Sequence, residues 1–377
     1  SGQDVPFDPA VLLGVLPNGM RYAIRRNTTP LGSVILRMRY DVGSIAEAED
    51  QRGLAHFIEH MAFNGSTHIA EGEMIPLLER NGLAFGPDTN ASTGIDETVY
   101  KLDLPRNDAA LIDTGLMLLR ETASELTLSE AAVERERGVI AAEVRTRDNF
   151  QLRNQIDSLQ FALPDSPIAR RLPSGSAEVI RTAPVARLRA LYDAYYRPER
   201  ATLVVVGDVD VAAMERKIRT RFADWQGRGA AGSPLDFGSV AVDRPTAADI
   251  YVQPDLPETV AIELLKPIIA EPDSRARRLQ RSLEGIGTSI LNRRLRTMAL
   301  APDARFIRAS FGITAVFDRF LDINLAAIAQ DGQWQPAMET VDLAYRQFLQ
   351  FGVSEAEIAE QVADIRTSLD NGVRGAE

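Results

Sequence analysis

The chain has 377 residues, with 42 Lys and Arg against 53 Asp and Glu, and a formal net charge of −11. This acidic balance argues against a general nucleic-acid-binding protein, which would carry a basic stripe. No run of residues approaches the roughly 20 apolar positions that span a bilayer, so we expect no membrane segment. The sequence contains no cysteine, which excludes disulfides and thiolate metal ligands.

A chain of this length exceeds one ordinary hydrophobic core and predicts two domains. Alternating apolar residues predict strands over 21–26 and 33–42, and β-favouring residues predict extended chain over 90–104. Helical patterns are followed by a buried strand at 202–206. The predicted helices cover residues 53–63, 71–81, 108–126, 130–149, 185–195 and 211–222, and residues 164–184 are rich in loop signals.

The glycine-rich stretch from Gln226 to Pro234 is the strongest linker signal in the chain. After it the order of elements begins again, with strands followed by helices. The predicted strands are 249–252, 260–265, 305–314 and 321–328, and the predicted helices are 273–299, 335–350 and 354–369. Runs of strands followed by runs of helices indicate an α+β architecture.

Two of the three histidines, His56 and His60, stand four residues apart on a predicted helix. Residues at this spacing share one helix face, with about 5–6 Å between their Cβ atoms, so both imidazoles can reach one metal ion. Glu59 lies three residues after His56 and faces roughly the same way. A solvated helix face is the alternative interpretation, but charged groups beside the apolar neighbours of this helix are costly unless they pair or bind metal.

A catalytic zinc usually has three protein ligands and a water, so a third ligand has to come from elsewhere. The helix predicted after Ser129 offers Glu134, Glu136 and Glu143. Glu136 and Glu143 are seven residues apart, which is two helical turns, and they face the same way. One of them can bind the metal while the other supports a histidine, and the spacing leaves open which does which.

The run His56-Phe57-Ile58-Glu59-His60 is the inverted zinc motif H-x-x-E-H. Its surroundings, residues 53–66, closely resemble the pitrilysin/insulinase family of peptidases, which includes mitochondrial processing peptidase and insulin-degrading enzyme. Several separate motifs follow the family's order, so the resemblance spans at least residues 15–226. Those motifs are Leu16-Pro17-Asn18-Gly19, residues 135–143, residues 195–199 and residues 204–208.

The resemblance implies zinc as the cofactor, with His56, His60 and Glu143 as its ligands. Glu59 would be the general base that deprotonates the attacking water, and Glu136 would be a supporting acid. Glu136 as the third ligand is the alternative assignment.

The same resemblance implies two homologous α+β domains, each with a mainly antiparallel sheet packed by helices. Residues 1–231 would form the zinc-bearing domain and residues 232–377 the second. Family enzymes enclose their substrate between two homologous halves, and this chain resembles the first half alone. We therefore expect a second half or a partner subunit, and a native chain that continues beyond residue 377.

Residues 90–94 align with the family's edge strand beside the zinc. Asn90, Ala91 and Ser92 would bind the substrate backbone there as an added strand, which gives affinity with little sequence preference. An edge strand without such a role is the alternative.

The expected function is zinc-dependent hydrolysis of peptide bonds in peptides or unfolded polypeptides. A non-catalytic or partner-dependent subunit of a two-subunit peptidase is the first alternative, and a metal hydrolase of small molecules is the second. Similarity to secreted bacterial insulinase-like proteins favours the periplasm as the location, with the cytoplasm as the alternative.

Overall fold

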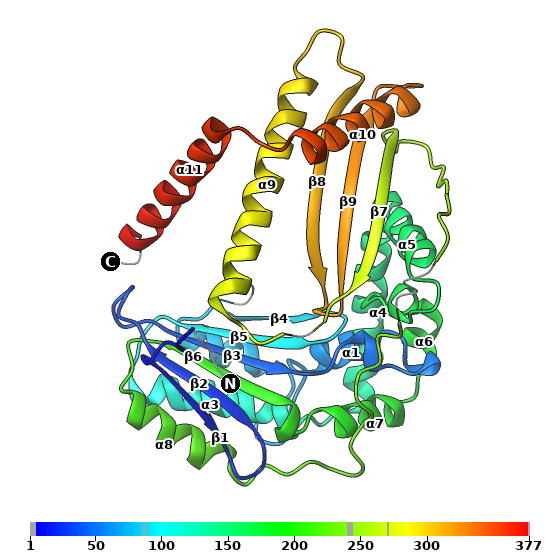
Figure 1. Ribbon diagram of the computed structural model, residues 1–377. Helices are drawn as coiled ribbons and strands as arrows, with labels where there is room; N and C mark the ends of the chain where they lie inside the picture. Colours follow the sequence, from blue (N-terminus) through cyan, green and yellow to red (C-terminus); the bar gives the residue numbers. More distant parts are fainter. Residues whose placement is uncertain (1–4, 85, 87–88, 240–243, 270, 376–377) are drawn as a thin grey trace. The chain divides into compact units, whose positions relative to one another are not determined.

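The computed structural model describes residues 5–84, 86, 89–239, 244–269 and 271–375. The chain forms two compact units: a first unit of residues 8–238, and a second unit of residues 239–377 together with 1–7. Each unit packs helices against a mainly antiparallel sheet (Figure 1), which confirms the predicted α+β class. The assignment of residues 1–231 and 232–377 to two homologous domains stays a prediction.

The first unit is built on a six-stranded sheet with the order β1-β2-β6-β3-β5-β4. Its strands are β1 (Val11–Val15), β2 (Arg21–Arg26), β3 (Val34–Tyr40), β4 (Thr89–Thr93), β5 (Thr98–Leu104) and β6 (Ala201–Gly207). β2 and β6 run parallel, and every other neighbouring pair is antiparallel. Alternate residues of β3, β5 and β6 are buried, as expected for strands with one face on a core.

Two parts of this sheet differ from the sequence prediction. The extended stretch predicted over 90–104 is a hairpin, because the chain turns between β4 and β5, where the Gly94 N–H donates to the Glu97 carbonyl at 2.7 Å. β1 carries no alternating pattern that would predict it. Its Gly14 lies under the Tyr22 ring, where an added Cβ would come within 2.0 Å of the ring.

Helices of the first unit pack on the sheet and on one another, with α3 against β5 and α8 against β2 (Figure 1). They are α1 (Leu54–Met61), α2 (Met74–Arg80), α3 (Ala109–Ser124), α4 (Glu130–Arg147), α5 (Phe150–Ala162), α6 (Ala177–Thr182), α7 (Val185–Tyr195) and α8 (Val211–Phe222). The sequence prediction did not include α5 or α6. α5 has no buried residue, although its Leu152, Ile156 and Leu159 recur at helical spacing. α6 interrupts the loop predicted over 164–184.

The predicted linker is bound to the first unit over part of its length. Arg197 donates to the Arg228 carbonyl at 3.0 Å, and Arg200 donates to the Gly232 carbonyl at 2.6 Å. The Gly232 N–H in turn donates to the Ala194 carbonyl at 2.9 Å. This stretch therefore extends the first unit up to residue 238.

The second unit has a three-stranded antiparallel sheet with the order β7-β9-β8. Its elements are β7 (Thr259–Pro267), α9 (Arg275–Ala299), β8 (Phe306–Val316), β9 (Phe320–Ala329), α10 (Trp334–Phe351) and α11 (Glu355–Arg374). α9 packs on β8 and α10 on β9, and their contacts enclose a small core that includes Leu291, Leu295 and Leu325. Among the described helices of both units, none combines the length and the apolar character needed to cross a membrane.

The prediction of a strand over residues 249–252 is wrong. Ile250 and Val252 are each 84% exposed, and in the described part of the chain this stretch forms no regular element. Apolar residues at alternating positions do not suffice for a strand, because its backbone N–H and C=O groups also need a neighbouring strand.

Candidate metal centre

Helix α1 carries the His56–His60 pair, and a carboxylate from the preceding loop caps its start. Gly53 precedes the helix with a φ of +98°, which glycine adopts without strain, and provides no side chain to cap the helix. Glu47 meets this need, because its two side-chain oxygens accept from the N–H groups of Gly53 and Ala55, each at 2.8 Å. Two N–H groups that a helix start leaves without partners are thereby satisfied.

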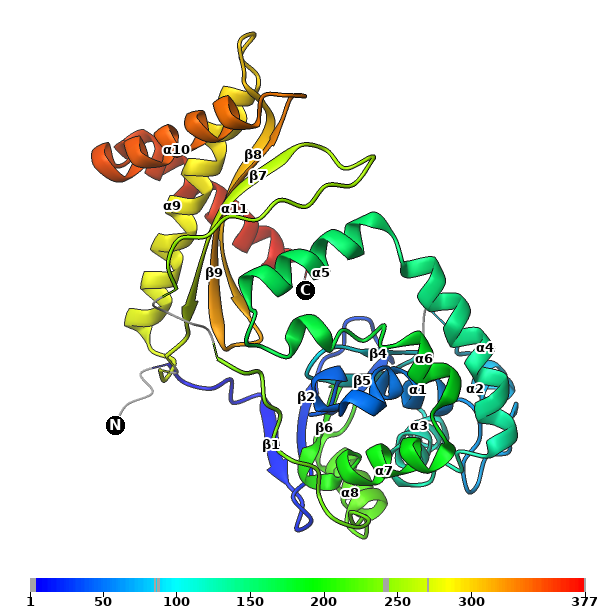
Figure 2. The ribbon, with the colours of Figure 1, turned by 90° about the vertical axis from the view of Figure 1, so that its right-hand side faces the viewer.

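The position of α1 is set by burial. Six of its eight residues are buried, and the helix contacts α4, α6, α7 and β4 (Figure 2). His56 and His60 stand one turn apart, with ring centroids separated by 4.7 Å and ring planes at 87°. Their Nε2 atoms lie 3.2 Å apart, so both rings point toward a common place.

Helix α4 brings two carboxylates to the same place. Ser129 caps this helix with its side-chain oxygen, and Glu136 and Glu143 lie two turns apart on the side that meets α1. Arg137 fixes the helix laterally, because its guanidinium donates to two carbonyls at the end of α6 and lies 5.8 Å from the centroid of the Phe57 ring.

Three potential ligand atoms converge between α1 and α4. The Nε2 atoms of His56 and His60 are 3.2 Å apart, and Glu143 oxygens lie 3.6 Å from the first and 3.3 Å from the second. Zinc holds N and O ligands at about 2.0–2.2 Å in a tetrahedron, which separates neighbouring ligand atoms by about 3.3–3.6 Å. The first Glu143 distance ends on Oε1 and the second on Oε2, so the three side chains come close enough to share one zinc ion.

Glu136 contacts His60 from the side away from this cluster. One Glu136 oxygen lies 2.8 Å from His60 Nδ1, and the other accepts from Asn64 Nδ2 at 3.1 Å. Asn64 also donates to the His60 carbonyl at 3.0 Å. An imidazole that donates from Nδ1 to a carboxylate keeps a lone pair on Nε2, which is the arrangement seen in metal-binding histidines.

The protonation of the two histidines differs. Burial lowers the pKa of His56 to about 4, assisted by the neighbouring His60, so this ring is neutral at pH 7. Burial also acts to lower the pKa of His60, but the hydrogen bond with Glu136 and the surrounding carboxylates outweigh it and raise the pKa. The neutral ring of His56 is the form that binds metals.

Glu59 lies beside the cluster and outside the three converging atoms. Its Oε2 accepts a hydrogen bond from Thr93 Oγ1 at 2.5 Å. Burial raises the pKa of Glu59, and the Thr93 bond and the His60 charge oppose this shift only in part. A carboxylate whose pKa is raised toward neutrality is suited to take up and return a proton.

Strand β4 forms the edge of the six-stranded sheet next to α1. Within the described residues, β4 pairs only with β5, so its outer backbone groups have no strand partner. Ser92 is exposed, whereas the side chains of Ala91 and Thr93 turn to the other face of the strand. An edge of this kind can accept an extended peptide as a further strand.

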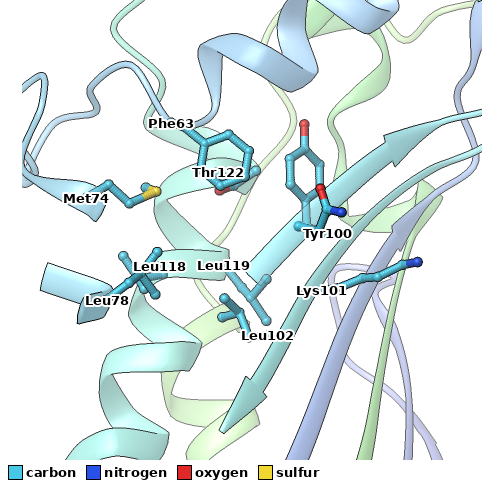
Figure 3. Close-up of a pocket in the computed structure, with 10 residues that line it drawn as sticks. Phe63, Met74, Leu78, Tyr100, Lys101, Leu102, Leu118, Leu119 and Thr122 are labelled. Carbon is cyan, nitrogen blue, oxygen red and sulfur yellow. The ribbon is translucent and has the colours of Figure 1, made fainter. Parts of the chain in front are cut away.

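An apolar pocket opens between the β4–β5 hairpin and the helices α2 and α3 (Figure 3). The lining side chains are mostly apolar or aromatic and include Phe63, Met74, Leu78, Tyr100, Leu102, Leu118 and Leu119. Asn90 of β4 also lines the pocket, so the edge strand contributes to its wall.

The structure thus gathers His56, His60, Glu143 and Glu136, with Glu59 beside them, and places Asn90, Ala91 and Ser92 on the edge strand. The third histidine, His68, lies outside the cluster, and its Nδ1 pairs with Glu121 at 2.7 Å.

Sequence reasoning missed the contacts of two polar residues. Asn64 lies just beyond the helix predicted over 53–63, and Thr93 lies within the extended stretch predicted over 90–104. Both contact residues that lie far away in the chain, and no local pattern signals such contacts.

The comparisons with known proteins agree with this fold and site. Two family models match: Insulinase (Peptidase family M16) over residues 22–161, and Peptidase M16 inactive domain over residues 183–364. The chain is 27% identical over 360 residues to the probable zinc protease PqqL of Haemophilus influenzae. This alignment covers 95% of this chain and 39% of that protein.

Two solved structures from Escherichia coli resemble the chain over nearly its whole length. The first half of the periplasmic protease PqqL has a TM-score of 0.85 and 25% identity, covering 98% of this chain and 79% of that one. The structure of the periplasmic protease PqqL has a TM-score of 0.86 and 26% identity, covering 99% of this chain and 41% of that one.

A two-unit α+β fold that matches an insulinase domain followed by a further domain of the same family defines the class of this chain. The chain belongs to peptidase family M16, the insulinase and pitrilysin family, as its motifs predicted. It spans about two fifths of the length of the PqqL proteins named above.

Proposed function

We propose that this chain is the metal-binding half of a zinc peptidase that hydrolyses peptide bonds. The carrying observation is the convergence of His56 Nε2, His60 Nε2 and the Glu143 carboxylate at separations of 3.2 to 3.6 Å. These three side chains would hold Zn²⁺, and Glu136 would keep His60 oriented. The name of the Haemophilus influenzae relative, a probable zinc protease, supports both the metal and the activity.

Glu59 is the general base in this proposal. A bound zinc ion supplies a Lewis acid that polarises the peptide carbonyl and lowers the pKa of water. Glu59 takes the proton of the attacking water and then gives it to the leaving amine. The upward shift of the Glu59 pKa through burial supports this role, because a carboxylate with a raised pKa is a stronger base and accepts the water proton more readily than an exposed one.

The outer edge of β4 would bind the substrate backbone along Asn90, Ala91 and Ser92. Backbone pairing reads no side chain, so it suits peptides or unfolded polypeptides of varied sequence.

A partner-dependent subunit is the second candidate function. The chain spans 39% of its Haemophilus influenzae relative and resembles a structure described as the first half of PqqL. A homologous second half, in the same chain or in a partner, would then be needed to enclose the substrate, with residues 1–231 as the zinc-bearing domain. The similar protein PqqL of Escherichia coli is a periplasmic protease, which supports a periplasmic location for this chain, and the cytoplasm is the alternative.

The replacement Glu59→Gln tests this function. We expect bound zinc to stay near one per chain while hydrolysis of a fluorogenic peptide falls about 10²–10⁴-fold, because proton transfer is lost and the ligands are kept. Glu79→Gln, a change at an exposed position of α2, is the matched control and keeps full activity.

The assay is run with and without the downstream half. Activity that appears only with that half favours the partner-dependent subunit. Full activity of Glu59→Gln contradicts the role of the base, and wild-type protein without zinc contradicts the metal centre.

A further inference from the structure

The last residue of the edge strand touches the proposed base. Thr93 ends β4, and its hydroxyl donates to Glu59 Oε2 at 2.5 Å. We propose that Thr93 is a positioning residue that holds the Glu59 carboxylate in its working orientation and ties it to the strand that binds the substrate. The inference rests on the proposed function, in which Glu59 is the general base.

The strand geometry aims the Thr93 hydroxyl. Successive side chains of β4 alternate between faces, so Thr93 turns away from exposed Ser92 and toward α1. A threonine is branched at Cβ and has few χ1 rotamers, which keeps the hydroxyl direction narrow. Thr93 is paired with Thr98 of β5, which is fully buried and donates to the Val42 carbonyl at 2.8 Å. The backbone that carries the Thr93 hydroxyl is thus anchored in the sheet.

The turn after Thr93 is docked on the loop that begins at Gly43. The Gly94 carbonyl accepts from the Ser44 N–H at 3.1 Å, and the Ile95 carbonyl accepts from the Ile45 N–H at 2.9 Å. The approach is so close that a Cβ added to Gly43 would lie 2.5 Å from the carbonyl oxygens of both turn residues. These two hydrogen bonds hold the end of β4 against the loop.

The same loop also holds α1. Four residues after Gly43, Glu47 accepts from the N–H groups of Gly53 and Ala55 at the start of the helix. Residues 43–47 therefore bind both the end of the edge strand and the start of the helix that carries Glu59. The hydrogen bond between Thr93 and Glu59 is a second, direct connection between this strand and this helix.

The chemical consequence concerns the freedom of Glu59. Its carboxylate ends a chain of three rotatable bonds, and the hydroxyl of Thr93 restrains one oxygen while the other stays available for a water proton. A substrate strand paired with β4 would be positioned by the same strand that holds Glu59 through Thr93. The base and the peptide backbone would therefore keep a fixed relative position. Small misplacements of a reacting group can cost about 10²-fold in rate.

The test compares Thr93→Val, which removes the hydroxyl and keeps the branched shape, with Thr93→Ser, which keeps the hydroxyl. We expect Thr93→Val to lower kcat about 10–100-fold with little change in KM, unchanged zinc content and unchanged Tm. Thr93→Ser should recover most of the lost kcat. Thr114→Val is the matched control, because the hydroxyl of Thr114 donates within its own helix to the Ala110 carbonyl.

Several outcomes overturn the inference. A kcat of Thr93→Val within twofold of the wild-type value would show that the hydroxyl does not orient Glu59. A loss of zinc or of stability in proportion to the loss of activity, or an increase in KM alone, would also contradict the orienting role. Failure of Thr93→Ser to recover activity would likewise overturn it. The Glu59→Gln variant measured alongside separates the two proposals: if that variant is active, the proposed function itself has failed.

Discussion

The two units of this chain share an architecture and differ in how much of it is buried. In the first unit, alternate residues of the central strands are enclosed, and Leu203 of β6 is fully buried. In the second unit, β7 leaves Ile262 and Leu264 about half exposed, and α11 has no buried residue. The first unit therefore offers a rigid support that the second lacks.

The candidate centre lies in the more enclosed unit. All three histidines of the sequence lie in the first unit, so the second cannot form a cluster of two imidazoles and a carboxylate. A metal site also needs its ligand atoms to stay at the right separations before the ion binds. In α1, six of the eight residues are buried, and this packing holds the two histidines in place. The comparison teaches that the shared fold class alone does not provide a site: burial and the right side chains have to coincide.

A pair of core substitutions measures the difference in burial. Leu203→Ala should cost about 2–5 kcal/mol, because it opens a cavity in a packed core. Leu264→Ala, at a half-exposed position, should cost about 1 kcal/mol or less. Urea unfolding can follow each unit separately, since Trp225 reports on the first and Trp334 on the second once the other tryptophan is replaced by Phe. Equal costs for the two substitutions would contradict the comparison.

Glu136→Gln tests whether the enclosed unit orients its ligands. The substitution weakens the hydrogen bond at His60 Nδ1, and loss of such a supporting partner typically lowers metal affinity about 10–100-fold. Competition with a chelator of known zinc affinity measures the change. Glu130→Gln, an exposed position in the first turn of the same helix, should leave the affinity as it is. An unchanged affinity in Glu136→Gln would show that His60 needs no such support.

In the second unit, the carboxylate of Glu357 is hydrogen-bonded at the start of α11, and we expect it to stabilise this helix alone. Its hydrogen bonds with Arg294 and with the Ser354 N–H lower its pKa to about 2. Because the unfolded pKa is near 4.3, the unfolded state binds more protons between the two values. The stabilisation of α11 is therefore complete above about pH 4.5 and is lost as the pH falls toward 2.

Hydrogen exchange of the α11 amides between pH 5 and pH 2.5 measures this loss. The wild-type protein should lose protection on acidification, and Glu357→Gln should start with less protection and change little. Identical pH profiles for the two proteins would show that Glu357 does not stabilise α11.

Much of the fold follows from local patterns, and the misses have physical causes. β3 was predicted because alternation of apolar residues reflects its one buried face, and β6 because its continuous apolar run is typical of a buried strand. Residues 249–252 show a similar pattern and form no strand, because apolar alternation does not supply a pairing partner. α5 was missed although Leu152, Ile156 and Leu159 recur at helical spacing, a pattern that predicts a helix.

The sequence by itself determined the relations within single helices. The spacing of His56, Glu59 and His60, and that of Glu136 and Glu143, puts each set on one face wherever the helix lies, because helical geometry is local. Only the tertiary structure decided that Glu143 meets the Nε2 atoms while Glu136 meets Nδ1 of His60, and that Thr93 reaches Glu59. These contacts join residues from about 30 to more than 80 positions apart, and packing of α1 against α4 and β4 creates them.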